Sequence, residues 1–149
     1  MNSQIHLTPV FGNLPPGIDL LRAEAACEGY RFLERLVTEW ISRRERFAHE
    51  GEALLAAYFG SELAGIGGMT IDPAVTGAWR MRRFYVRASF GRLGIGRQLA
   101  LSLLERSRPL RCQVTVNAGT PDASPFWEAL GFMPDPRNGH THIFHPWNS

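Results

Sequence analysis

The sequence has few cysteines and no long apolar run. Its 149 residues include two cysteines, Cys27 and Cys112, which stand alone and in no metal-ligand spacing. Isolated thiols argue against a disulfide framework and suit a reducing compartment. No apolar run approaches the roughly 18 residues of a membrane span, and no secretory signal pattern opens the chain. We therefore expect a cytoplasmic protein with no membrane partner.

The chain also lacks a strong excess of charge. Lys and Arg total 16 and Asp and Glu total 14, so the formal net charge is +2. Binding of nucleic acid usually requires a strongly basic face, and this balance argues against such a partner. The apolar fraction of 44% is ordinary for a globular protein. A chain of this length can fold without a metal or disulfide, and we expect a single domain over residues 1–149.

The hydrophobic pattern predicts strands interleaved with helices. The expected strands are 4–11, 53–59, 63–71, 78–86, 111–116 and 141–145, and the expected helices are 18–27, 30–46, 94–107 and 124–130. Ser124 is a candidate N-cap, and the prolines at 134 and 136 predict a loop. Short hairpin connections and one strand–helix–strand unit over 78–116 predict an α/β fold. Its sheet is mixed and twisted, mostly antiparallel with one parallel β-α-β step, and helices cover both faces.

The stretch from 82 to 100 is the most informative part of the chain. Residues 84–86, Phe-Tyr-Val, are typical of a strand, and a helical repeat of apolar residues begins about ten positions later. Between them, Gly91, Gly94 and Gly96 free the backbone. A helix N-terminus presents unpaired amides and partial positive charge, so this loop is either a simple turn or a pyrophosphate site. The fingerprints of Walker loops and dinucleotide folds are absent.

Two separated motifs resemble the GNAT superfamily of N-acetyltransferases, and in particular a prokaryotic branch of it. Residues 84–86 and the loop 91–96 are similar to the family's acetyl-CoA loop, with Gly91 in place of the usual Arg or Gln. Asn117 and the run 123–132, Ala-Ser-Pro-Phe-Trp-Glu-Ala-Leu-Gly-Phe, resemble its second signature. Residues 141–143 are a weaker match to its closing strand. The resemblance covers nearly the whole chain and implies the GNAT fold.

The resemblance implies an enzyme that moves an acetyl group from acetyl-CoA, its co-substrate, to a primary amine of a small molecule. The amine attacks the thioester directly, and the backbone N–H of Tyr85 would stabilise the oxyanion. No metal is implied, and homodimers occur in the family. The implied acetyl-CoA-binding residues are Phe84, Val86, Arg92, Leu93, Gly94, Ile95, Gly96, Arg97, Asn117, Phe126 and Trp127.

The sequence departs from the family at the proton-transfer positions. Trp127 stands where many members have a Tyr that acts as general acid, and Arg80 stands where many have a catalytic Glu. Neither side chain transfers protons near neutral pH. The base is therefore left open between a water chain and four side chains. These candidates, each of which also has an ordinary structural explanation, are Asp72, Glu52, His49 and His142.

Arg80 could instead bind an acidic group on the substrate, which makes an anionic amine the expected acceptor. The alternative is a surface arginine at the edge of the sheet. The predicted substrate-binding residues are Arg80, Trp40 and Asp72. Two other functions stay open at this point: a non-catalytic acyl-CoA-binding or regulatory module, and an acetyltransferase for protein lysines or N-termini.

Overall fold

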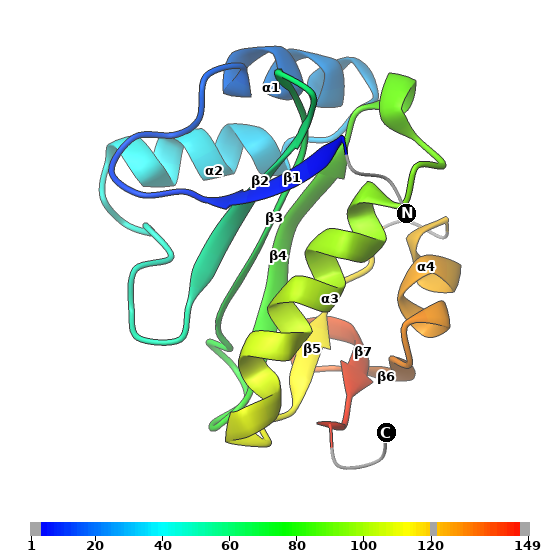
Figure 1. Ribbon diagram of the computed structural model, residues 1–149. Coiled ribbons are helices and arrows are strands. Elements are labelled where there is room, and N and C mark those ends of the chain that lie inside the picture. The colour runs from blue at the N-terminus through cyan, green and yellow to red at the C-terminus, as the bar shows by residue number, and fades with distance from the viewer. Residues whose placement is uncertain (1–3, 120–121, 147–149) are drawn as a thin grey trace.

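A single seven-stranded sheet organises the computed structural model, which describes residues 4–119 and 122–146 (Figure 1). The strands are β1 (Ile5–Pro9), β2 (Ala53–Phe59), β3 (Glu62–Ile71), β4 (Trp79–Val86), β5 (Val114–Val116), β6 (Met133–Arg137) and β7 (His140–Phe144). The helices are α1 (Ile18–Cys27), α2 (Phe32–Ile41), α3 (Ile95–Ser107) and α4 (Ala123–Ala129), with short 3-10 turns at Ala88–Phe90 and Arg108–Leu110. The strand order is β1-β2-β3-β4-β5-β7-β6, and the β4–β5 pair is the parallel one. The predicted fold class is confirmed.

Two apolar clusters lie on opposite faces of the sheet. The cluster beneath α1 and α2 contains Leu33, Leu36 and Trp40, the stripe that the helical spacing of α2 turns to one side. The cluster beneath α3 and α4 contains Leu99 and Trp127. Figure 1 shows α1 and α2 on one side of the strands and α3 and α4 on the other. None of the helices in the described residues is long and apolar enough to cross a membrane.

Helix α2 is shorter than its sequence pattern predicts. It ends at Ile41 instead of continuing to residue 46, because Arg43 adopts a left-handed backbone conformation with φ 63°. The amide of Arg44 then bonds back to the Glu39 carbonyl at 2.9 Å. Arg46 folds over the helix end, and its Nε donates to the Trp40 carbonyl at 2.7 Å. The basic residues expected in the last turn therefore lie in the connection to β2.

Two predictions for the C-terminal third are wrong. The segment expected to be a loop forms β6, because this strand is at the edge of the sheet, where a proline loses no ladder hydrogen bond. Helix α4 begins at Ala123 with Asp122 as its N-cap residue, and no side chain caps it by a hydrogen bond. Ser124 is therefore inside the helix and is not its cap.

Strands β4 and β5 part after a short contact. Three residue pairs join them, from Trp79–Val114 to Met81–Val116. Beyond Met81, β4 continues to Val86 and stays paired with β3 on its other side. Among the described residues, no strand pairs with this last part of β4 on the β5 side. The sheet therefore has an opening in its middle, bounded by β4 on one side and the end of β5 on the other.

Candidate functional site

The open edge of β4 offers backbone groups to a ligand. The Arg87 amide donates to the Ala64 carbonyl of β3 at 2.9 Å. Backbone groups alternate in direction along a strand, so those of Tyr85 also face β3, where Ile66 lies opposite. The backbone groups of Phe84 and Val86 consequently face the opening. An extended ligand could pair with them as an added strand.

A bulge shapes this edge. Arg83 has φ 62°, and the register between β3 and β4 shifts at the same point, between Ile66 and Gly68. Residues other than glycine rarely adopt this left-handed backbone conformation, and such strain concentrates at functional sites. The neighbouring position 67 of β3 requires glycine, because a Cβ there would lie 2.9 Å from the Phe84 ring. The Phe84 ring thus depends on a residue without a side chain in the next strand.

The glycine loop leads directly into α3. Gly94 is the N-cap residue with φ 82°, which glycine adopts without strain, and its carbonyl accepts from the Gln98 amide at 2.9 Å. This bond is the first of the helix, so the amides of residues 95–97 precede the hydrogen-bond ladder. Arg92 and Arg97 are exposed beside them. Free amides, the positive end of the helix dipole and two arginines form an arrangement that suits a phosphate group.

The two sequence motifs meet in an aromatic cluster around Trp127. This side chain is only 4% exposed. Its ring makes edge-to-face contacts with Phe84 at 4.9 Å, Phe126 at 4.9 Å and Phe132 at 5.1 Å. Phe84 belongs to the first motif and the others to the second. Trp127 therefore holds α4 against the open edge of β4. Asn117, of the same motif, is exposed just beyond β5, where its side chain accepts from the Gly119 amide at 3.1 Å.

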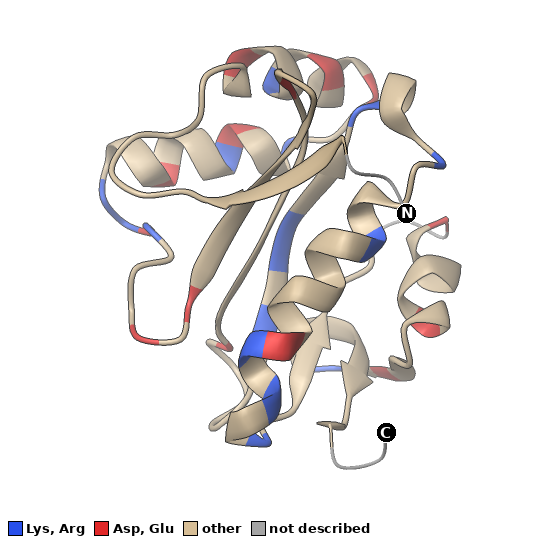
Figure 2. Cartoon of the chain, in the orientation of Figure 1, with Lys and Arg blue, Asp and Glu red and all other residues tan. Residues whose placement is uncertain are grey.

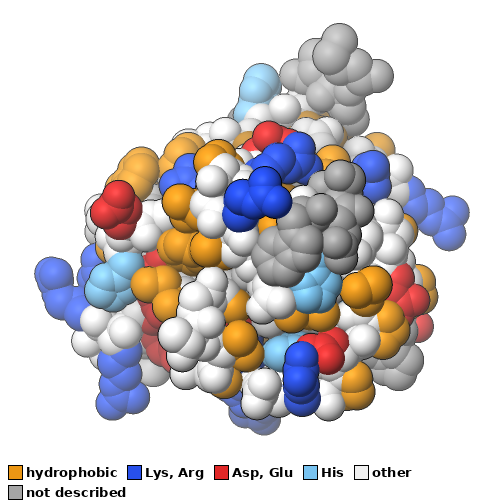
Figure 3. Space-filling view, turned by 90° about the horizontal axis from the view of Figure 1, so that it is seen from below, with side chains coloured by type: hydrophobic (Ala, Val, Ile, Leu, Met, Phe, Trp, Pro, Cys, Tyr) orange, Lys and Arg blue, Asp and Glu red, His pale blue; other side chains and the backbone are white. Residues whose placement is uncertain are grey.

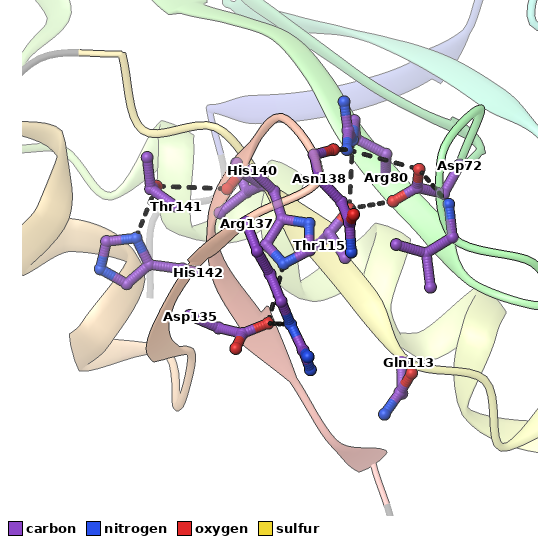
Figure 4. Close-up of polar contacts among 12 residues, drawn as sticks. Asp72, Arg80, Gln113, Thr115, Asp135, Arg137, Asn138, His140, Thr141 and His142 are labelled. Atoms are coloured by element: carbon purple, nitrogen blue, oxygen red, sulfur yellow. Dashed lines mark hydrogen bonds and ion pairs between the residues drawn. The ribbon is translucent and has the colours of Figure 1, made fainter.

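Asp72 and Arg80 are brought together, but inside the protein. Asp72 accepts hydrogen bonds from the Thr115 hydroxyl at 2.6 Å and from the amides of Ala74 and Val75 at 2.7 and 3.0 Å. The guanidinium of Arg80 lies 3.3 Å from the same carboxylate. These contacts, drawn in Figure 4, join β3, β4 and β5 at the place where the parallel pair forms.

Arg80 is also tied to the hairpin of β6 and β7. Its Nε donates to the Thr115 hydroxyl at 3.2 Å, and one terminal nitrogen donates to the Asn138 carbonyl at 3.0 Å. Burial alone would raise the pKa of Asp72, but the hydrogen bonds from Thr115 and the two amides, with Arg80 nearby, hold it below its ordinary value. Asp72 is therefore ionised at neutral pH, and its oxygens are engaged by donors inside the fold.

Other predicted site residues also have partners inside the fold. The buried Glu52 accepts from the amides of His49 and Ile71 at 3.1 and 3.0 Å. Trp40 is buried under α2, and its Nε1 donates to the Gly12 carbonyl at 2.8 Å. His49 itself is exposed. These contacts give Glu52 and Trp40 structural roles, and a role of Trp40 in binding substrate stays a prediction.

A carboxylate–imidazole–hydroxyl chain lies at the end of β5. The Nε2 atom of His142 is 2.8 Å from Glu128 Oε2, and its Nδ1 atom is 2.7 Å from Thr141 Oγ1. The Thr141 hydroxyl accepts from the Ala118 amide at 3.0 Å. An Nε2–H tautomer of His142 donates to the carboxylate, and its Nδ1 then accepts from the Thr141 hydroxyl, whose single proton has the Val116 carbonyl at 3.3 Å as its other acceptor. The sequence singled out His142, with Thr141 as its chain neighbour, but gave no sign that Glu128 lies beside it.

The Tyr85 hydroxyl points away from this opening. It donates to Glu28 of α1 at 3.0 Å. Burial, this hydrogen bond and the nearby carboxylates of Glu28 and Glu24 raise the pKa of Tyr85 well above its ordinary value. The phenol therefore stays protonated at neutral pH and cannot act as an acid there.

Seen from below, the molecule shows scattered charges of both signs and several histidines, without a continuous field of one sign (Figure 3).

A parted sheet next to a glycine loop at a helix N-terminus is an arrangement that suits an extended ligand with a phosphate group, such as an acyl-CoA. The sequence model of the family described as "Acetyltransferase (GNAT) domain" matches residues 22–142. The chain belongs to this family, and it is an acetyltransferase with acetyl-CoA as its donor. No curated protein sequence matches the chain.

Solved bacterial structures share the fold. A candidate acetyltransferase from Exiguobacterium sp. 255-15 superimposes with a TM-score of 0.85 at 21% identity, covering 95% of this chain and 93% of that one. A GNAT family acetyltransferase from Elizabethkingia anophelis, solved with acetyl-CoA bound, has a TM-score of 0.62 at 14% identity, covering 96% and 99%. An acetyltransferase from Thermus thermophilus has a TM-score of 0.66 at 18% identity, covering 97% and 98%.

Proposed function

We propose that this enzyme acetylates the primary amine of a small molecule by direct attack of the amine on the thioester of acetyl-CoA. The observation that carries the proposal is the opening beside β4, which is lined by the backbone groups of Phe84 and Val86 and is followed along the chain by the glycine loop and the start of α3. The donor supplies an activated acetyl group. Its pyrophosphate would lie at residues 92–97, and its extended arm would pair with β4.

The oxyanion donor is a backbone amide at the bulge of β4. Alternation along the strand favours the amide of Phe84, because it faces the opening. The amide of Tyr85, which the sequence suggested, stays a prediction, and its strand position directs it toward β3. In the reaction the amine nitrogen forms a bond to the acetyl carbon, the carbon–sulfur bond breaks, and the thiolate leaves and takes its proton from solvent.

His142 is the side chain best placed to receive the proton of the amine. Of the four candidates, Asp72 and Glu52 are engaged by buried donors. His49 is exposed, and no side-chain partner within residues 4–119 and 122–146 orients it. His142 is oriented by Glu128 and reaches the Thr141 hydroxyl at the end of β5. The proton passes from the amine through this hydroxyl, or a water beside it, to Nδ1, and Glu128 stabilises the imidazolium.

The first test is ligand binding followed by turnover. Acetyl-CoA and CoA should each raise the melting temperature, and a ligand at a hundred times its Kd stabilises by about 2.7 kcal/mol. A panel of primary amines should then release free thiol only in the presence of enzyme. Binding without turnover of any amine would favour the non-catalytic module, and turnover restricted to peptides would favour the protein acetyltransferase. The 149 residues contain no lysine, so lysine self-acetylation adds no background to a peptide assay.

Replacing His142 by glutamine should lower kcat about 100-fold or more, because general-base catalysis contributes on that order, while the KM for acetyl-CoA stays within about twofold. Glu128→Gln should lower kcat less, since the imidazole keeps a hydrogen-bond partner. The matched control is His49→Gln, which should leave kcat unchanged. Melting temperatures recorded for all three variants separate catalysis from folding. A His142→Gln enzyme with normal kcat would assign proton removal to water.

A further inference from the structure

Strand β4 carries three arginines on the face covered by α2, and Figure 2 shows the basic positions along this strand. Neighbouring residues of a strand normally point to opposite faces, but the bulge turns two of these side chains the same way. The guanidinium of Arg83 lies 2.8 Å from Glu39 of α2. That of Arg82 lies 3.7 Å from Glu45, in the segment after α2. Two guanidinium groups are therefore held next to each other above one face of the sheet.

These two arginines are less well satisfied than their neighbour. Arg80 has a carboxylate, a hydroxyl and a carbonyl as partners. The Arg83 side chain is only 11% exposed, and its Nε is buried with no hydrogen-bond partner among the described residues. Within the described residues, the Arg82 side chain has one long ion pair, with Glu45, and no hydrogen bond. An unmet buried donor costs about 1–3 kcal/mol, so an acceptor oxygen that reached this donor would be stabilising.

The charge environment agrees with the geometry. Burial lowers the pKa of Arg82, and the positive charge of Arg83 lowers it further, while Glu39 and Glu45 act in the opposite direction. The net lowering means that the surroundings disfavour the cation. An anion bound between the two guanidinium groups would offset this. Guanidinium nitrogens match the paired oxygens of a carboxylate or phosphonate and bind them in a forked geometry.

The position of the pair links it to the reaction. Arg82 is the first residue of β4 beyond the last pair with β5, Met81–Val116. The strand opens at this residue, and the Phe84 amide follows at the edge of the opening. A group bound to Arg82 and Arg83 thus lies beside the place where the acceptor amine must approach, on the face opposite α3 and α4.

We propose that Arg82 and Arg83 bind the anionic group of the acceptor, which is a compact amine bearing a carboxylate or phosphonate. This inference rests on the acetyl transfer proposed above and assigns its acceptor specificity. Arg80, which the sequence favoured for the same task, instead holds Asp72, Thr115 and the β6–β7 hairpin together.

The test compares acids with their uncharged partners. Glycine, β-alanine and 4-aminobutyrate are assayed beside their amides, and 2-aminoethylphosphonate beside ethylamine. The wild-type enzyme should prefer the anionic members. Arg82→Gln should lower kcat/KM for these about 10- to 100-fold, the effect of losing a hydrogen bond between charged groups, and change the neutral members less than about twofold. Preference for carboxylates over the phosphonate, or the reverse, identifies the anion.

Arg106→Gln is the matched control, because it removes the same charge from an exposed position on α3. Arg106→Gln should leave kcat/KM unchanged for both the anionic and the neutral acceptors. Glu45→Gln should have the opposite effect to Arg82→Gln. It removes the carboxylate that competes for Arg82, so kcat/KM for the anionic acceptors should rise several-fold. A purely structural ion pair would not produce this rise. Equal effects of Arg82→Gln on acids and amides, or no rise with Glu45→Gln, would overturn the proposal.

A binding experiment separates this inference from the proposed function. Calorimetry with the CoA-loaded protein compares N-acetyl-β-alanine with its neutral amide. The acid should bind more tightly to the wild type, and the difference should disappear in Arg82→Gln. If no amine is acetylated but this difference is present, the anion site stands and the proposed function fails. If amines are acetylated but acid and amide bind alike, the anion site fails and the proposed function stands.

Discussion

Replacement of Asp72 by alanine should lower the free energy of unfolding by about 3–5 kcal/mol, the range for removing one partner of a buried ion pair. The Asp72 side chain is fully buried and serves the Thr115 hydroxyl, two backbone amides and the guanidinium of Arg80. Alanine would remove the acceptor of the two amides and the closest acceptor of the Thr115 hydroxyl, and Arg80 would lose its only carboxylate partner among the described residues. Chemical denaturation followed by circular dichroism measures the loss. Asp19, whose side chain is 80% exposed in a pair with Arg22, is the matched control, and Asp19→Ala should change stability by less than about 0.5 kcal/mol.

The same carboxylate should give the fold an acid-sensitive component. The pKa of Asp72 is lower in the folded protein than its ordinary value of 3.8. A lowered pKa stabilises the fold above the unfolded pKa, and the contribution is lost as pH falls through the folded value. The wild type should therefore lose stability below about pH 4 more steeply than Asp72→Asn does. Parallel denaturation curves for the two proteins between neutral and acid pH would contradict this assignment.

Replacement of Trp127 by alanine should cost about 3–5 kcal/mol of stability and also weaken the binding of acetyl-CoA. The buried indole contacts three phenylalanine rings, and one of them, Phe84, is on the open edge of β4. Its removal leaves a cavity between α4 and β4, and Phe84 loses the contact that positions it. Denaturation and titration with acetyl-CoA measure the two effects.

Two further variants separate packing from chemistry at this position. Trp127→Phe keeps an aromatic ring in the cluster, and it should recover part of the stability and most of the acetyl-CoA affinity. Leu110→Ala changes an exposed apolar side chain and should lie within about 0.5 kcal/mol of the wild type. If Trp127→Phe folds well but loses turnover with normal acetyl-CoA affinity, the indole would have a direct role in the reaction.

The architecture was predictable where local patterns decide it. The apolar stripe of α2, the glycine-bounded strands β2 and β3 and the strand–loop–helix unit around Gly94 all depend on residues close in sequence. The errors have a different origin. The prolines of β6 are tolerated only because this strand is at the edge of the sheet, and position in a sheet is a property of the whole fold. The early end of α2 depends on the positive φ of Arg43, a position that sequence rules reserve for glycine or asparagine.

The site divides in the same way. The glycine loop is a short motif, and the structure places it directly before α3, as the sequence predicted. Its binding of acetyl-CoA stays a prediction. The contacts of Asp72 with Thr115 and of His142 with Glu128 join residues that are distant in sequence, and no spacing rule identifies such pairs. The paired orientation of Arg82 and Arg83 depends on a bulge, without which alternation would send the two side chains to opposite faces.

The short β4–β5 contact also has a mechanical consequence. The sheet has two parts, β1 to β4 and β5 to β7, and only three residue pairs between β4 and β5 join them. Because stability is not uniform across a structure, strands β5 to β7 can separate from β4 as a unit while β1 to β4 keep their backbone hydrogen bonds. If the donor occupies the opening as proposed, it lies between the two parts of the sheet and should make this opening motion less frequent. Amide hydrogen exchange in β5 and β7 should then report occupancy of the site, although the donor covers little of either strand.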